Sequence, residues 1–130
     1  MKFHLNQAEG LNLFTAFGDN HLFINQQRYD QPGLLVGPDS IDPDWSDGQF
    51  DALSSRHFEV MLALAPEIAL LGTGDRQRFP HPSLIAPLIN AGIGIEIMDT
   101  RAACRTYNIL VSEGRKVVIA LLMHGQQPQR

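Results

Sequence analysis

The stretch from Gly92 to Arg115, GIGIEIMDTRAACRTYNILVSEGR, constrains the fold more than any other part of the chain. It begins with isoleucine at every second position, which is the alternation of a β-strand. A helical pattern starts at Asp99-Thr100, where either side-chain oxygen can accept a free N–H of the first helical turn. Gly114 is a natural end for this helix, and an apolar strand follows at once. The stretch therefore predicts a strand, a capped helix and a second strand.

The rest of the chain continues this alternation of strands and helices. The turn-forming cluster Gly18-Asp19-Asn20 lies between two apolar runs and predicts a β-hairpin. Residues 29–32 are polar and break the pattern, and residues 38–51 predict irregular structure or a weak edge strand with Trp45 packed on the core. We expect the tail, 124–130, to be frayed. The expected strands are 11–17, 21–25, 33–37, 67–71, 93–98 and 117–123, and the expected helices are 56–65, 82–91 (with Pro87 as a kink or a later start) and 100–113.

Several of these strands are apolar along nearly their whole length, which indicates a central α/β sheet covered on both faces. The connection from strand 67–71 through helix 82–91 to strand 93–98 should be a right-handed parallel crossover. A length of 130 residues suits one domain with its own core, and we expect a single domain over residues 1–130.

Composition and charge exclude several classes of protein. The net charge of -4 argues against nucleic-acid binding, which needs clustered lysine and arginine. Cys104 is the single cysteine, so an internal disulfide is impossible and nothing argues for secretion. The first ten residues lack the apolar core of a signal peptide, and the apolar run 117–123 is far shorter than a membrane helix. We therefore expect a cytoplasmic protein that does not insert into a membrane.

Two turns are the best candidates for a functional site. Gly72-Thr73-Gly74 and Asp99-Thr100 each follow a predicted strand, and ligands bind outside the carboxyl ends of strands in open α/β sheets. If the strands are neighbours, the turns line one crevice, where backbone N–H groups and Thr100 could hold an anion that Asp99 would oppose. The alternative is that the glycines only turn the chain and Asp99 only caps the helix.

Known catalytic and metal-binding patterns are absent. Gln77 stands where a dinucleotide fingerprint needs its third glycine, and the chain has neither a phosphate-binding loop nor a GxSxG elbow. The five histidines are scattered, so we expect no metal site and no cofactor. Helical spacing places Cys104 near the core side of its helix without a nearby base, which favours a buried, unreactive thiol.

Three segments of the sequence resemble a known family. They are LLGTGDR at 70–76, GIGIEIMDT at 92–100 and AACRTYNILVSEGRKV at 102–117. The chain is similar here to a small single-domain family of unknown biochemical activity. That family includes mitochondrial complex I assembly factor 3 and stand-alone bacterial and archaeal relatives.

The resemblance implies a fold, a site and a style of action. The implied fold is three-layered α/β, with a mixed, mostly parallel central sheet flanked by helices and an N-terminal β-hairpin layer. Our first hypothesis is a non-enzymatic adaptor or assembly factor that binds an unidentified protein partner through the crevice. The alternative is a domain or enzyme that binds a small anionic molecule in the same crevice. The candidate binding residues are Gly72, Thr73, Gly74, Asp99, Thr100, Arg105 and Asn108.

Overall fold

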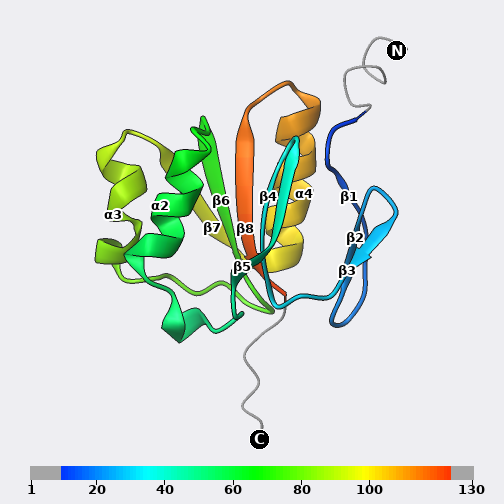
Figure 1. Ribbon diagram of the computed structural model, residues 1–130, viewed down its shortest axis with the longest axis horizontal. Helices are drawn as coiled ribbons and strands as arrows, with labels where there is room; N and C mark the ends of the chain where they lie inside the picture. Colours follow the sequence, from blue (N-terminus) through cyan, green and yellow to red (C-terminus); the bar gives the residue numbers. More distant parts are fainter. Residues whose placement is uncertain (1–9, 124–130) are drawn as a thin grey trace, which may run out of the picture.

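The computed structural model describes residues 10–123, so the predicted tail 124–130 lies outside the described residues. Strands and helices alternate along the chain, and the strands form two sheets (Figure 1). The strands are β1 Phe14–Phe17, β2 Leu22–Ile24, β3 Gln27–Tyr29, β4 Gly33–Gly37, β5 Ser40–Ser46, β6 Ile68–Thr73, β7 Gly94–Met98 and β8 Val117–Leu122; the helices are the short 3-10 helix η1 Phe50–Ala52 and the α-helices α2 Ser55–Ala63, α3 Pro82–Asn90 and α4 Thr100–Ser112.

The main sheet has five strands in the order β5-β4-β8-β6-β7. β6 pairs in parallel with both β7 and β8, while β4 pairs antiparallel with β8 and with β5. The predicted parallel crossover from β6 through α3 to β7 is confirmed, and the strands it joins are neighbours. The sheet is mixed as expected, its four pairings being divided equally between the two directions.

The two faces of this sheet carry separate cores. Along β8, Ile119 and Leu121 face α4, whereas Val118 and Ala120 face α2 and α3. This division follows from the strand geometry, because successive side chains point to opposite faces. Every β8 residue is buried, so the near-continuous apolar run of this strand reflects cover on both sides. Figure 1 shows the resulting layers, with α2 and α3 on one side of the sheet and α4 on the other.

A second, three-stranded antiparallel sheet made of β1, β2 and β3 packs beside α4 (Figure 1). The predicted hairpin at Gly18-Asp19-Asn20 joins β1 to β2. The sequence prediction missed β3 and placed a break at residues 29–32, although Tyr29 is the last residue of this strand. The turn before it has positive φ at both Asn25 (48°) and Gln26 (77°). That geometry belongs to a tight hairpin turn, which glycine usually signals and which glutamine does not.

The structure decides between the alternatives that the sequence left open for residues 38–51 and for the helix at 82–91. The stretch 38–51 contains β5, an edge strand, and the indole of Trp45 is buried with its N–H donating to His57 O at 3.0 Å. Helix α3 runs from Pro82 through Pro87 without starting later. Helix α2 begins after Ser54, whose backbone N–H donates to the His57 imidazole at 3.0 Å.

Candidate functional site

The carboxyl ends of β6 and β8 and the start of α4 are tied together by one threonine. The Thr100 hydroxyl accepts from Gly74 N–H at 2.8 Å and donates to Leu122 O at 2.6 Å. Its backbone N–H donates to Gly74 O at 2.9 Å. Thr100 is therefore a structural clasp and is buried. The helix cap is Asp99 instead, whose carboxylate accepts from Ala102 N–H at 3.1 Å.

Gly72 allows α4 to lie close against β6. A Cβ atom at this position would lie 2.9 Å from Thr100 Cα and 3.4 Å from Ala103 Cβ. These are atoms of the helix backbone and its shortest side chain, which cannot rotate away. Gly72 is thus required by helix–sheet packing and lies beneath the helix, away from any open crevice.

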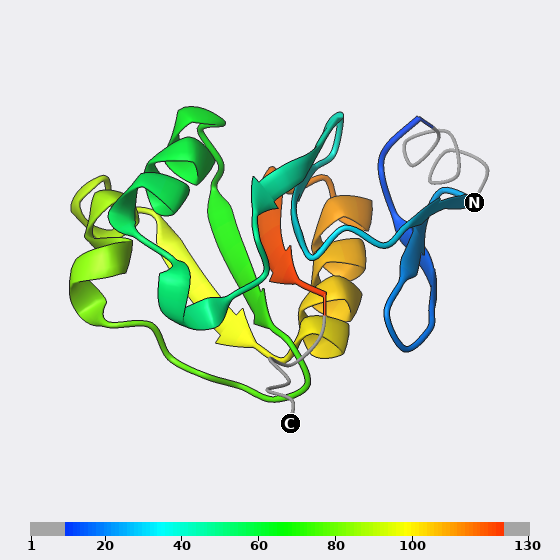
Figure 2. The same ribbon diagram turned by 60° about the horizontal axis from the view of Figure 1, so that its bottom comes forward.

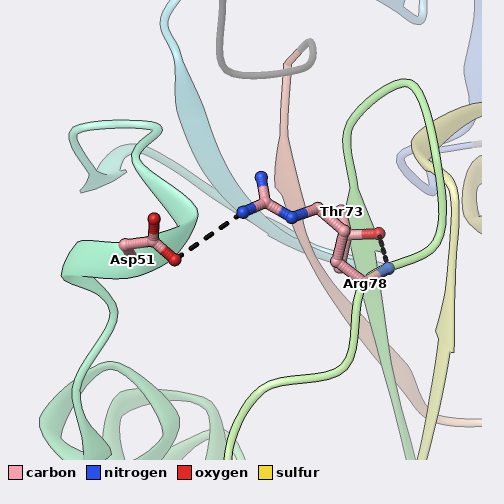
Figure 3. Close-up of polar contacts among 3 residues, drawn as sticks. All are labelled: Asp51, Thr73 and Arg78. Carbon is pink, nitrogen blue, oxygen red and sulfur yellow. Dashed lines mark hydrogen bonds and ion pairs between the residues drawn. The ribbon is translucent and has the colours of Figure 1, made fainter. Parts of the chain in front are cut away.

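Thr73 organises the loop that follows β6. Its hydroxyl lies 2.7 Å from Arg76 O and 3.1 Å from Met98 O, either of which can accept its proton, and it accepts from Arg78 N–H at 3.1 Å. Figure 3 shows Arg78 between this hydroxyl and Asp51, with 3.6 Å between the guanidinium and the carboxylate. The same guanidinium lies 4.2 Å from the centre of the Phe50 ring. The loop is therefore anchored to η1 by side-chain contacts.

A pocket of about 190 Å³ opens between the β1–β2 turn and the first residues of α4. We call it the carboxyl-end pocket, because it lies where β6 and β8 end. One part of the lining is the hairpin turn, a second is the turn after β6, a third is the start of α4, and Met123, directly after β8, completes it. Its lining residues are Phe17, Gly18, Asp19, His21, Leu22, Gly74, Asp75, Asp99, Thr100, Arg101 and Met123.

The lining of the carboxyl-end pocket is polar and mainly acidic. Asp19, Asp75 and Asp99 contribute three carboxylates, and Asp19 and Asp75 are exposed at its rim. Among the described lining residues, Arg101 alone carries a guanidinium, which lies 5.4 Å from the Phe17 ring centre and 3.4 Å from Gly18 O. These contacts hold Arg101 against the hairpin wall. The pocket can therefore hold hydrogen-bond donors and positively charged groups on its acidic side.

The predicted binding residues separate into two groups. Gly74, Asp99 and Thr100 line the carboxyl-end pocket, whereas Gly72 and Thr73 lie behind it in the helix–sheet and loop packing. The remaining two are Arg105, exposed on α4, and Asn108, which binds the backbone of β1. The Asn108 amide donates to Phe14 O at 2.7 Å and accepts from Phe14 N–H at 2.9 Å.

Sequence reasoning missed the hairpin side of the pocket. The turn itself was predicted, but no pattern in the sequence says that the hairpin docks beside α4. The structure shows one contact that docks the hairpin there, the hydrogen bonds of Asn108 with the backbone of β1. These bonds join residues 94 positions apart, which a local sequence pattern does not reveal. Arg101 directly follows the predicted turn at Asp99-Thr100, and this adjacency could have added it to the candidates.

Two titratable groups lie in the core beneath α4. Burial raises the pKa of the Cys104 thiol well above its usual range, and the thiol side chain is fully buried. Burial also raises the pKa of Tyr107, and the Asp39 carboxylate adds to this effect. Among residues 10–123 the Tyr107 hydroxyl has no hydrogen-bond partner. Neither residue lines the carboxyl-end pocket.

Residues 10–123 contain neither a cluster of metal-ligating side chains nor a membrane-spanning helix. No three histidine, cysteine or carboxylate side chains within this range are placed to hold a metal ion together. Within the same range, none of the helices has the length and apolar character needed to cross a membrane.

Comparisons with known proteins place the chain among relatives. The profile of a family described as "Protein of unknown function (DUF498/DUF598)" matches residues 14–122. The chain is 30% identical over 104 residues to the 13 kDa major membrane protein of Francisella tularensis, covering 80% of this chain and 85% of that protein. It is 31% identical over 109 residues to NADH dehydrogenase (ubiquinone) 1 alpha subcomplex assembly factor 3 of Bos taurus, covering 82% of this chain and 58% of that protein.

The fold is shared with solved structures. A crystal structure of a Bordetella parapertussis protein superposes with a TM-score of 0.82 at 40% sequence identity. The match covers 89% of this chain and 98% of that one. At this level of similarity, the layers and the main sheet correspond along most of both chains.

Proposed function

The chain belongs to the DUF498/DUF598 family of proteins of unknown function, and from this membership we propose that it is a protein-binding assembly factor. The family includes proteins named as complex I assembly factors, alongside a bacterial protein named for its presence in a membrane. This chain spans only 58% of the bovine assembly factor, so the activity and partners of that protein are not carried over as a whole. What is carried over is binding to another protein.

We place the contact with the partner protein at the carboxyl-end pocket. The small volume of this pocket is the observation that carries the proposal. Pockets for small molecules and cofactors usually have volumes of about 300–1,000 Å³. The carboxyl-end pocket, at about 190 Å³, is smaller, but it can hold one side chain of a partner. With Asp19, Asp75 and Asp99 around it, the favoured occupant is a lysine or arginine of a partner segment that lies across the rim. No catalytic step is part of this proposal.

A cytoplasmic location goes with the proposal. Cys104 is a free, buried thiol, the state that a reducing compartment maintains. The net charge of -4 disfavours a nucleic acid as the partner.

One observation favours a second candidate, a small anionic ligand in the same pocket. Arg101 lies at the start of α4, where the free N–H groups of a helix attract anions. The three carboxylates of the lining oppose this ligand. A melt of the wild-type protein in inorganic phosphate tests it, because a bound anion raises the melting temperature with concentration, and Arg101→Ala should remove that rise.

A charge-reversal capture experiment tests the protein-binding proposal. The wild type, Asp19→Lys/Asp75→Lys and the control Glu59→Lys/Glu113→Lys are used as baits in lysate of the native cell. Both double variants change the net charge by the same amount at exposed positions, but the control positions are not in the pocket lining. We expect a protein that the wild type and the control recover and the pocket variant loses. Equal recovery by all three baits, or recovery of no protein by the wild type, contradicts the proposal.

A further inference from the structure

The main sheet ends on two very different edge strands. β5 contains Pro43 between Asp42 and Asp44, and proline with charged residues is a common device against edge-to-edge pairing. β7, the last strand on the other side (yellow in Figure 2), has the sequence GIEIM with one charge, Glu96. Among the strands of residues 10–123, β7 pairs with β6 alone, so within this range its outer side is a free edge.

The hydrogen bonds show which peptide groups of β7 point outward. The Gln77 side-chain amide, from outside the sheet, donates to Ile97 O at 2.8 Å. The peptide N–H and C=O groups of successive strand residues point alternately to the two sides of the strand. Those of Ile93, Ile95 and Ile97 therefore point outward, and those of Gly94 and Glu96 point to β6. Ile93 N–H already donates to Leu88 O at 3.0 Å. Within residues 10–123, four outward groups then have no hydrogen-bond partner: Ile93 C=O, Ile95 N–H, Ile95 C=O and Ile97 N–H.

These four groups match a second copy of the same edge. In an antiparallel pair with a twofold axis at Ile95, Ile95 N–H and C=O bond their counterparts in the other copy. In that register Ile97 N–H of each copy donates to Ile93 C=O of the other copy. The two groups that would also face each other are Ile93 N–H, bonded to Leu88 O, and Ile97 C=O, bonded to the Gln77 amide. Pairing at this point therefore requires the exposed Gln77 side chain to move aside. We propose that the chain forms a twofold dimer through β7, which joins two five-stranded sheets into one.

Charge selects this register over its neighbour. With the axis at Ile95, each Glu96 lies opposite Gly94 of the other copy. An axis at Glu96 would place two like charges directly opposite each other, which is destabilising. Gly94 also leaves room for the facing carboxylate, because a Cβ built there meets nothing within 4 Å.

Apolar burial adds to the pairing. Ile95 and Ile97 lie on the sheet face that α2 and α3 cover, and both are only half-buried in one copy. In the proposed register the Ile95 side chains of the two copies become direct cross-strand neighbours, and Ile97 neighbours Ile93 of the other copy. β-branched residues in such pairs stabilise a sheet. The dimer leaves the carboxyl-end pocket open, because no residue of β7 lines it.

Two substitutions at one position test the proposal by sedimentation equilibrium. Gly94→Lys places a positive charge opposite Glu96 of the other copy, and Gly94→Glu places a negative charge there. Each dimer contains two such pairs, so the dissociation constant should fall between about twofold and about thirtyfold in the lysine variant and rise by a similar factor in the glutamate variant. Added salt should reduce both shifts. Circular dichroism melts establish that both variants are folded.

Amide hydrogen exchange of the wild-type protein gives an independent readout. The amides of Ile95 and Ile97 should exchange more slowly as protein concentration rises, whereas exposed amides of β5 should not change. A chain that stays monomeric throughout the concentration range overturns the proposal. It is also overturned by a dimer whose dissociation constant moves in the same direction in both Gly94 variants, or by unchanged exchange at Ile95 and Ile97.

Discussion

Thr100 and Gly74 are joined by two hydrogen bonds that run in opposite directions. The Thr100 N–H donates to Gly74 O at 2.9 Å, and the Thr100 hydroxyl accepts from Gly74 N–H at 2.8 Å. The hydroxyl proton goes to Leu122 O on β8. One side chain thus fixes the start of α4 against the ends of two strands, and these three segments are the inner walls of the carboxyl-end pocket.

Removing the Thr100 hydroxyl should destabilise the protein. Thr100→Val keeps the shape of the side chain but leaves Gly74 N–H and Leu122 C=O unpaired in a buried place. We expect a loss of roughly 1–3 kcal/mol in the free energy of unfolding, the usual cost of unsatisfied buried groups. Urea denaturation measures it, and Thr100→Ser, which keeps the hydroxyl, should recover most of the loss. An unchanged midpoint for Thr100→Val would show that the two hydrogen bonds of the Thr100 hydroxyl contribute little to stability.

Gly72→Ala should also destabilise the protein, because its new methyl group would lie 2.9 Å from Thr100 Cα. Separation of α4 from β6 is then the only relief, at a cost of roughly 1–3 kcal/mol for an overpacked site. Gly94→Ala is the matched control. Its methyl group would meet nothing within 4 Å, so its denaturation midpoint should stay the same or rise. Equal effects of the two substitutions would contradict the close-packing role of Gly72.

The sequence predicted the main sheet better than the site, and the reason is the range of the interactions. Strands such as β8 are apolar at every position, and this pattern is local. The pocket depends instead on where the hairpin docks, and the contacts that dock it, such as that of Asn108 with Phe14 across 94 positions, are long-range. From the sequence, Arg105 and Asn108 are together candidate binding residues, and nothing there distinguishes an exposed side chain from one that holds a strand.

Asn108→Ala should loosen the hairpin layer. Its amide makes two hydrogen bonds with the Phe14 backbone, at 2.7 and 2.9 Å, and their loss leaves both backbone groups of β1 without this partner. We expect a loss of roughly 1–3 kcal/mol and faster amide exchange in β1 and β2. Arg105→Ala, at an exposed position of the same helix, should stay within about 0.5 kcal/mol of the wild type. Equal losses in the free energy of unfolding for Arg105→Ala and Asn108→Ala would contradict a special role of Asn108 in holding β1.

Alkaline pH should destabilise the protein through the two buried groups under α4. Burial raises the pKa of both Cys104 and Tyr107 in the folded state. In the unfolded chain these groups titrate near their ordinary pKa values of about 8.5 and about 10. Below about pH 8 both stay protonated in both states, so their contribution to stability is fully present. As pH rises from there toward the raised folded values, the unfolded chain releases protons that the folded protein retains, and stability falls.

Two substitutions assign this alkaline loss to its groups. Urea midpoints are measured from about pH 8 to about pH 11 for the wild type, Cys104→Ala and Tyr107→Phe. Each variant should have a flatter profile, because one group contributes up to about 1.4 kcal/mol for each pH unit between its two pKa values. At neutral pH, Tyr107→Phe should be neutral or stabilising, since the hydroxyl it removes has no partner among residues 10–123. A wild-type profile as flat as those of the variants, or rapid labelling of Cys104 by a thiol reagent in the native protein, would show that these side chains are not held in a closed core.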